Sequence, residues 1–413
     1  MKSQEKIFIL LLLQALALTG SSLTGFALPL LLFKGSDQIS GLGLLYFFQI
    51  WPGFLVSFLA GYITDRFSRR WVSIISLIAY LLNLACLGFF HHFNSLDRLI
   101  IYFFTINLSI INAFQALSLC TLISENVRNE TRVLVNILLS LRNTVPRLLA
   151  PALSGFLVAQ NEISTIVEID FIIHILFLFV VFVLSHNFNS SKDNQIKLLD
   201  YKKVLSFIGK QKTMQKTLLS LLHTNATTSV FGVFIIPIAL NFMNEHQIGF
   251  NLSMGGIGSV VGACCFQRNF FKLNLNHILF FSHLIQGFSL FFLVIFSFYD
   301  YFGLFLFFYF FTVPIQNGHS YSVWQESTNP SLYGRLFASK GMILQASSII
   351  VFFLIGYIGD WILIPTTSRI LSPDKGYLGL CFFISALGIT HIIAASRIFL
   401  RSRLISEFQY EKV

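Results

Sequence analysis

Ionisable side chains stand inside long apolar runs of the sequence, where burial without a partner is costly. Arg147 lies near the middle of the run 133–159, and Asp170 lies in the run 163–185. Arg147 has two open interpretations: it faces a cavity and binds an anionic ligand group, or it forms a structural pair with an acid such as Asp170. Asp170 could carry a proton, because burial disfavours the charged form of a carboxylate, or it could make a polar contact near a helix end.

Amide and aromatic side chains accompany these charges in two further apolar runs, 99–123 and 301–326. Rings and amides together could hold an aromatic or polyol ligand, although Phe-rich runs also face lipid. Single histidines inside apolar runs, at positions 223, 283, 319 and 391, are more typical of the core than of a site. The candidate substrate-binding or coupling residues are Arg147, Asp170, Asn112, Gln115, Gln316, Asn317, His319 and Trp324.

The composition indicates the kind of element that carries these residues. Of the 413 residues, 55% are hydrophobic and only 11% are charged, whereas a soluble domain carries about a quarter charged residues. The chain therefore has too little polar surface for a water-soluble globule and is expected to be an all-α integral membrane protein.

Runs long enough to cross a bilayer, about 20 residues each, number twelve. A stretch with seven lysines separates the first six from the last six, and it predicts a basic helix on the membrane surface. The expected parts are an N-terminal six-helix half (1–186), a cytoplasmic linker (187–216) and a C-terminal six-helix half (217–413). The runs lie near 7–33, 41–63, 71–90, 99–123, 133–159, 163–185, 217–242, 247–266, 277–298, 301–326, 336–364 and 376–399.

Basic residues accumulate in the linker and in the other loops that follow even-numbered spans. The opposite loops hold only Lys34, Arg98, Arg369 and Lys375. Because Lys and Arg are enriched on the cytoplasmic side, both termini and the linker are expected in the cytoplasm of an inner-membrane protein. This bias explains the net charge of +10 without a nucleic-acid partner.

The two halves also resemble each other in sequence. The segment 123–157 aligns with 324–358, so that Arg132 matches Arg335 and Gly155 matches Gly356. Repeated halves are typical of transporters whose site lies between the repeats.

The stretch GYITDRFSRR, between spans 2 and 3, resembles the loop signature of the major facilitator superfamily. Gly61, Asp65, Arg66, Arg69 and Arg70 match that signature, while Ser68 replaces its second glycine. The resemblance covers essentially the whole chain and implies twelve helices in two six-helix halves. It also implies a cytoplasmic gate, for which the candidates are Gly61, Asp65, Arg66, Arg69, Arg70, Arg132 and Arg335.

The run NTVPRLLAPALSGFL resembles the proline–glycine motif of exporters in that superfamily. Pro151 and Gly155 match it as helix-packing residues, whereas Ala150 and Ser154 replace glycines. Together with Arg147 and Asp170, this run is similar to the enterobactin-exporter and macrolide-efflux branch. The arginine typical of span 4 is missing, which puts the usual coupling arrangement in doubt.

These observations predict a secondary active transporter that exports an amphiphilic drug or siderophore in exchange for protons. The alternatives are an importer of a siderophore or nutrient and a membrane receptor that does not transport. The sequence lacks ATP-binding and hydrolase motifs, so no enzymatic activity, cofactor or metal is expected. The expected partners are a small-molecule substrate, a proton and the lipid bilayer, and the chain is expected to be a monomer.

The predicted orientation has a direct test. Reporter fusions after Lys203 and after Val413 should be cytoplasmic, whereas a fusion after Asn94 should be external. Phosphatase and fluorescent-protein reporters at each site would measure this. A linker or C-terminus found outside would contradict the twelve-span topology.

The resemblance at positions 61–70 generates a second expectation. Asp65→Asn should leave membrane insertion intact and slow transport, because the mutant loses the acid proposed to brace the gate. The measurement is initial transport rate at equal protein level, with a conservative Asp65→Glu variant as the control. Wild-type turnover in Asp65→Asn would reduce the stretch to a topology signal.

Overall fold

The computed structural model describes residues 3–93, 95–127, 146, 149–160, 162–185, 201–267, 274–295, 301–328, 333–372 and 375–410. The chain divides into two compact units, one of residues 1–198 with 245–249 and one of residues 199–244 with 250–413. All regular structure in the described part is helical, as expected for apolar segments that must satisfy their backbone groups internally in lipid.

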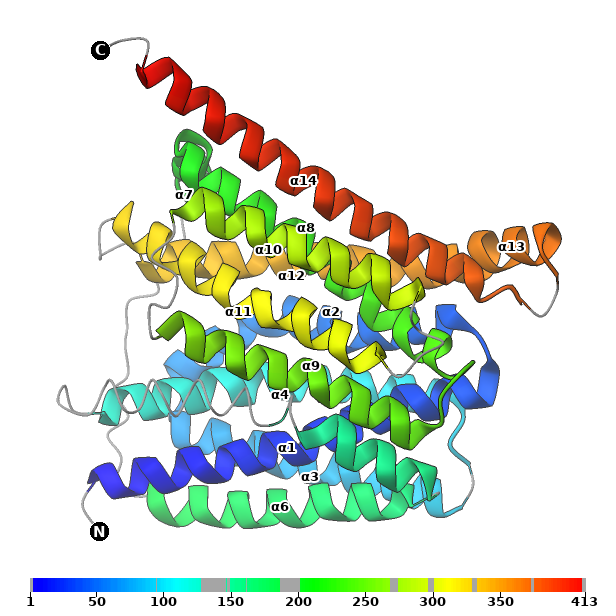
Figure 1. Ribbon diagram of the computed structural model, residues 1–413. Helices are drawn as coiled ribbons and strands as arrows, with labels where there is room; N and C mark the ends of the chain where they lie inside the picture. Colours follow the sequence, from blue (N-terminus) through cyan, green and yellow to red (C-terminus); the bar gives the residue numbers. More distant parts are fainter. Residues whose placement is uncertain are drawn as a thin grey trace. The chain divides into compact units, whose positions relative to one another are not determined.

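Unit 1 is a bundle of long helices that is seen in blue to green in Figure 1. Helix α6 packs against both α1 and α3, and α4 packs against α2 and α3. Leucine, phenylalanine and tyrosine side chains such as Leu45, Tyr80 and Phe104 fill the space between these helices. The helices are α1 (Ser3–Ser36), α2 (Ile39–Arg66), α3 (Arg69–His92), α4 (Arg98–Asn126), the apolar helix Leu149–Ala159, and α6 (Ile163–Leu184).

Unit 2 contains the remaining helices, except that residues 245–249 at the start of α9 belong to unit 1. Its most extensive pairing is that of α10 with α14. Helix α8 packs against α12, α11 and α14, and α10 packs against α11. The helices are α7 (Tyr201–Lys210), α8 (Lys212–Ala239), α9 (Glu245–Gln267), α10 (Leu275–Ile295), α11 (Phe302–Glu326), α12 (Tyr333–Ile358), the π-helical turn η4 (Gly359–Leu363), α13 (Ile364–Ile370) and α14 (Leu378–Tyr410).

The all-α membrane fold predicted from the sequence is confirmed. Among the described residues, ten helices are long and apolar enough to cross a membrane. Two of the twelve predicted spans are not among those ten. The run 301–326 forms the 25-residue helix α11, and the run 133–159 is described only at Pro146 and from Leu149 onward.

The C-terminal half of the short linker helix α7 packs against other helices of unit 2. Ile208 is buried in an apolar cluster with Met214, Trp324 and Leu336, and Phe207 packs at its edge. Part of the apolar side of α7 is therefore covered by α8, α11 and α12 of unit 2. Amphipathic sequence alone does not separate these two environments, because lipid and an apolar protein face satisfy the same side chains.

Candidate functional site

A buried carboxylate forms the centre of a polar cluster in unit 1. The Asp170 side chain is fully buried, and its Oδ2 atom accepts a hydrogen bond of 2.7 Å from the Thr24 hydroxyl. The Tyr80 hydroxyl lies 3.0 Å from the same oxygen. Helices α1, α3 and α6 thus each contribute a side chain, and the carboxylate has donors that compensate for its removal from water.

His174, one helical turn after Asp170, completes this cluster. Its Nδ1 atom lies 2.9 Å from the backbone oxygen of Asp170 and 2.8 Å from carboxylate Oδ1. The contact of Nδ1 with the backbone oxygen has the geometry of a hydrogen bond, whereas its contact with Oδ1 does not. The contact with Oδ1 is an ion pair only when the imidazole is protonated. The Tyr80 and His174 rings stack with centroids 4.0 Å apart. We call Ser21, Thr24, Tyr80, Asp170 and His174 the Asp170 site.

Small residues on α1 allow α6 to approach closely enough to form this site. A β-carbon added at Gly20 would lie 2.8 Å from Asp170 Oδ1 and 3.2 Å from the Asp170 α-carbon. Ser21, the next residue, accepts a 2.9 Å hydrogen bond from Tyr80 and lies 3.4 Å from His174 Nε2. Close approach through glycine and serine is the usual packing mode in membranes, where no hydrophobic force draws helices together.

The Asp170 site has two self-consistent hydrogen-bond arrangements. The Tyr80 hydroxyl carries one hydrogen, and its two acceptors are Asp170 Oδ2 and Ser21 Oγ. With Asp170 ionised, that hydrogen points to the carboxylate. With Asp170 protonated, the carboxylic acid donates to Tyr80, and Tyr80 donates to Ser21. In both arrangements the Tyr80 hydroxyl has an acceptor for its hydrogen, so rotation of that hydroxyl accommodates a proton on Oδ2, while the buried Oδ1 accepts no hydrogen bond.

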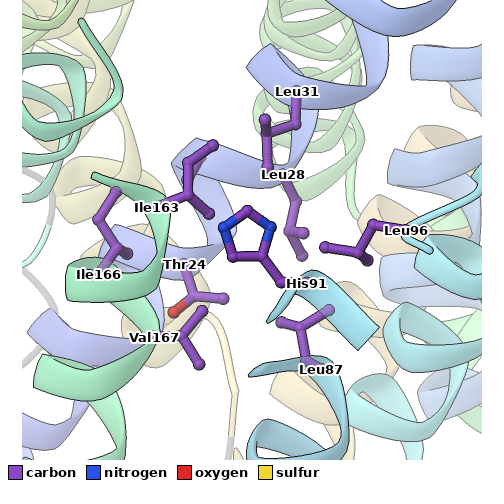
Figure 2. A pocket seen from close by; sticks show the side chains of 10 residues that line it. Thr24, Leu28, Leu31, Leu87, His91, Leu96, Ile163, Ile166 and Val167 are labelled. Atoms are coloured by element: carbon purple, nitrogen blue, oxygen red, sulfur yellow. The ribbon is translucent and has the colours of Figure 1, made fainter. Parts of the chain in front are cut away.

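A small cavity lies on the other side of Thr24. Its volume is about 10 Å³, close to the minimum for one water molecule. Figure 2 shows the His91 imidazole in the middle of an otherwise apolar ring of side chains, with Thr24 as the second polar group. His91 and Val167 also line a larger groove of about 380 Å³ with His92, Ser164 and Glu168, where α3 ends and α6 begins.

The predicted residue Gln316 belongs to a second polar cluster, in unit 2. Its side chain is fully buried; Oε1 accepts from the Thr224 hydroxyl at 3.0 Å and Nε2 donates to Ser220 Oγ at 2.6 Å. Gln286 of α10 extends this network, because Nε2 donates to Thr312 at 3.0 Å. Gln316 therefore connects α11 to α8 within unit 2.

The other candidates on α4 and α11 lie apart from both clusters. Asn317 and Asn112 are exposed, and Gln115 and His319 are half-buried. The His319 ring meets the Phe266 ring edge to face, with centroids 4.9 Å apart. Trp324 is fully buried, and its indole nitrogen donates to Thr217 at 2.8 Å. That burial in an apolar cluster favours a packing role for Trp324 over the predicted ligand contact.

The arginines of positions 61–70 occupy three different environments. Arg66 is exposed and donates to the Tyr62 hydroxyl at 2.7 Å. Arg70 donates to the Phe182 carbonyl oxygen at 3.0 Å and lies over the Phe182 ring, whereas Arg69 is buried at the start of α3. At Gly61 an added β-carbon would meet no described atom within 4 Å.

The proline–glycine pair lies in a tight contact within unit 1. A β-carbon added at Gly155 would be 2.8 Å from the Gly249 α-carbon, and one added at Gly249 would clash with the Pro151 oxygen. Several candidates have no described side chain. Arg132 and Arg147 lie outside the described residues, and the side chains of Asp65 and Arg335 are likewise not described.

The sequence singles out Asp170 as a candidate but not the residues that surround it in the structure. The signal for His174 was present, because residues four apart lie on one face of a helix. Tyr80, Ser21 and Thr24 gave no such signal. Hydroxyl groups are common in apolar spans, and only the packing of α1 and α3 on α6 brings these three to the carboxylate.

Comparison with known proteins identifies relatives of the fold. Residues 10–352 match the Major Facilitator Superfamily, and a comparison with curated proteins gave no matching relative. A bacterial homologue of the human lysosomal transporter Spinster superposes with a TM-score of 0.72 at 13% identity, covering 97% of each chain.

Two further solved structures have the same fold. A variant of the nucleoside transporter NupG has a TM-score of 0.72 at 14% identity and covers 96% of this chain and 100% of its own. A D-xylose–proton symporter has a TM-score of 0.71 at 11% identity and covers 96% of this chain and 97% of its own. At these identities the likeness establishes the fold.

The hydrogen bond from Thr24 should stabilise unit 1 measurably. Thr24→Val should lower the free energy of unfolding by about 1–3 kcal/mol, because a buried carboxylate loses a donor. Thr19→Val on the same helix is the control, since that hydroxyl bonds the Ala15 carbonyl one turn away. Denaturant unfolding in detergent measures both variants, and equal losses would remove Thr24 from the Asp170 site.

Proposed function

The chain belongs to the Major Facilitator Superfamily, and from that premise we propose that it is a proton-coupled secondary transporter. It moves a small organic molecule across the membrane by alternating access. The proposed direction is export, in exchange for protons, of an amphiphilic drug or siderophore, as in the enterobactin-exporter and macrolide-efflux branch. The alternatives are import of a siderophore or nutrient and a receptor that does not transport.

The observation that carries proton coupling is the fully buried Asp170 carboxylate. An ionisable group inside a membrane span is expensive, which makes it a functional candidate by default. The Tyr80 hydroxyl can match either protonation state of Oδ2, by donating to Asp170 or to Ser21. A purely structural acid needs only one such arrangement.

A route for the proton to Asp170 is also available. The groove at His91, His92 and Glu168 lies at the end of unit 1 that the positive-inside rule places outside. His91 lines both this groove and the small cavity. Thr24 lines the same small cavity and donates a hydrogen bond to Asp170. Protons thus enter from the external side, as a transporter driven by an inward proton gradient requires.

The solved relatives support a small-molecule substrate. Their names describe transport of a nucleoside by one protein and of D-xylose with a proton by another. Both substrates are small molecules with several polar groups. The exposed or half-buried Asn112 and Gln115 of unit 1, and Asn317 and His319 of unit 2, are the proposed substrate contacts in this chain. Gln316, which the unit 2 network holds, is proposed to support the contacts of α11.

Two further roles are retained as proposals. Arg147 binds an anionic group of the substrate or pairs with an acid, and Asp65 with the neighbouring arginines forms the cytoplasmic gate. The six-helix halves joined by the linker 187–216, the inner-membrane location with both termini cytoplasmic, and the monomeric state complete the proposal.

Replacing the buried acid should separate transport from the proton gradient. In proteoliposomes with an internal pH-sensitive dye, Asp170→Asn should abolish the proton flux that substrate addition causes. Exchange of substrate for substrate should persist, since it needs no net proton movement. The test substrates are ethidium, an amphiphilic cation, and 2,3-dihydroxybenzoate, a catecholate.

The matched control is Glu162→Gln, an exposed acid at the start of α6. It should leave proton flux and exchange unchanged. Proton flux at the wild-type rate in Asp170→Asn would exclude Asp170 as the coupling group. Reversing the imposed pH gradient distinguishes export from import, because the two predict opposite directions of substrate accumulation.

A further inference from the structure

Three histidines that are far apart in sequence converge in unit 2. His223 of α8, His283 of α10 and His391 of α14 each offer one ring nitrogen, and these three nitrogens lie within 4.8 Å of one another. The Nδ1 atoms of His283 and His391 are 2.8 Å apart. The His223 ring stacks on His391 with centroids 4.0 Å apart. His283 and His391 are buried, whereas His223 is half-buried.

A glycine crossing holds two of these histidines together. A β-carbon added at Gly287 would lie 2.7 Å from the Gly388 oxygen, and one added at Gly388 would lie 2.7 Å from the Gly287 oxygen. The backbones of α10 and α14 therefore touch at this point. His283 precedes Gly287 by one turn and His391 follows Gly388 by one turn, so the crossing fixes the separation of the two imidazoles.

The outer nitrogens of all three rings have hydroxyl partners. His283 Nε2 lies 2.6 Å from Ser220 Oγ, and His391 Nε2 lies 3.1 Å from Thr227 Oγ1. His223 Nε2 lies 2.9 Å from Thr390 Oγ1. Histidines that bind a metal through one nitrogen typically donate the other N–H to such an acceptor, which fixes the tautomer and the ring orientation.

We propose that His223, His283 and His391 bind one divalent transition-metal ion, with Zn²⁺ as the reference case. Neutral imidazole nitrogen is a preferred ligand of Zn²⁺, Ni²⁺ and Cu²⁺. Tetrahedral Zn²⁺ with bonds of about 2.0–2.1 Å places its ligand atoms about 3.3 Å apart. The present separations, from 2.8 Å to at most 4.8 Å, bracket that value.

Binding requires the His223 ring to turn out of its stack on His391, because the lone pair of an imidazole nitrogen lies in the ring plane. The hydrogen bonds of His283 and His391 can adapt by a change of tautomer. Without metal, the two facing Nδ1 atoms can share a hydrogen bond only if one of them carries the proton. Metal binding moves that proton to the Nε2 atom of the same ring, where the Ser220 or Thr227 hydroxyl accepts it. Each imidazole stays neutral, and both Nδ1 lone pairs face the ion.

Three histidines leave a fourth coordination position open. A site with three protein ligands and one open position admits water or a donor atom from another molecule. The half-buried His223 marks the side from which the ion enters. The metal would connect α8, α10 and α14 of unit 2. This proposed metal site shares no residue with the Asp170 site, and it does not depend on the proposal of proton coupling.

The test uses the full chain in detergent, with any affinity tag removed and trace metal stripped by chelator. Titration with Zn²⁺ should give one equivalent bound per chain, by elemental analysis after desalting. X-ray absorption should show about three imidazole nitrogens at about 2.0–2.1 Å. Co²⁺ in place of Zn²⁺ should give the visible absorption of a tetrahedral site.

The variants connect binding to the three rings. His223→Gln, at the half-buried position, should weaken Zn²⁺ binding at least about tenfold, and Thr227→Ala should weaken it about 10- to 100-fold. His319→Gln is the control, because that histidine lies on α11 against Phe266 and outside the cluster. It should bind like the wild type.

Two results would overturn the proposal. One is a wild-type chain that binds less than half an equivalent of Zn²⁺. The other is an affinity equal in wild type, His223→Gln and Thr227→Ala, which would place the bound ion elsewhere. Thermal unfolding of each metal-free variant verifies that it is folded, so that a loss of binding reports on the site.

Discussion

The cost of placing a polar group in hydrocarbon governs the arrangement of this protein. Water is absent from the bilayer core, so each buried donor and acceptor must find its partner inside the bundle. The hydroxyls of Thr24 and Tyr80 meet Asp170 for this reason. The amides of Gln286 and Gln316 connect to threonines and a serine in the same way. Polar pairing between helices, added to apolar packing, fixes how each helix is rotated.

The two polar clusters solve this problem with different chemistry. In unit 1 an acid and a histidine lie on one helix, and partners from two other helices surround them. In unit 2 amides, hydroxyls and imidazoles form a network without a carboxylate among the residues named here. The acid of unit 1 is held by hydroxyl donors, whereas the imidazoles of unit 2 face one another and hydroxyl groups.

Hydropathy predicted the helices well, because the length of an apolar run is a local property. The bounds of α3, α6 and α11 differ from the predicted runs by only a few residues. Asp170 was found because an acid is rare in such a run. The grouping of His223, His283 and His391 could not be predicted, since it depends on the rotation of three helices and on one glycine crossing. The burial of Trp324 could not be predicted for the same reason. The sequence around an aromatic residue is the same whether its side chain contacts a ligand, a lipid or a core residue such as Leu336.

The contact of Gly287 with Gly388 has a mechanical consequence. Two backbones in direct touch cannot slide past each other without a steric clash from the neighbouring side chains, such as Ile392 beside Gly287. Helices α10 and α14 are therefore expected to move together as one rigid pair, so that a rearrangement of unit 2 would occur at other helix pairs. Replacing either glycine by alanine would push the two helices apart. The close contact between these two helices thus depends on residues that have no side chain.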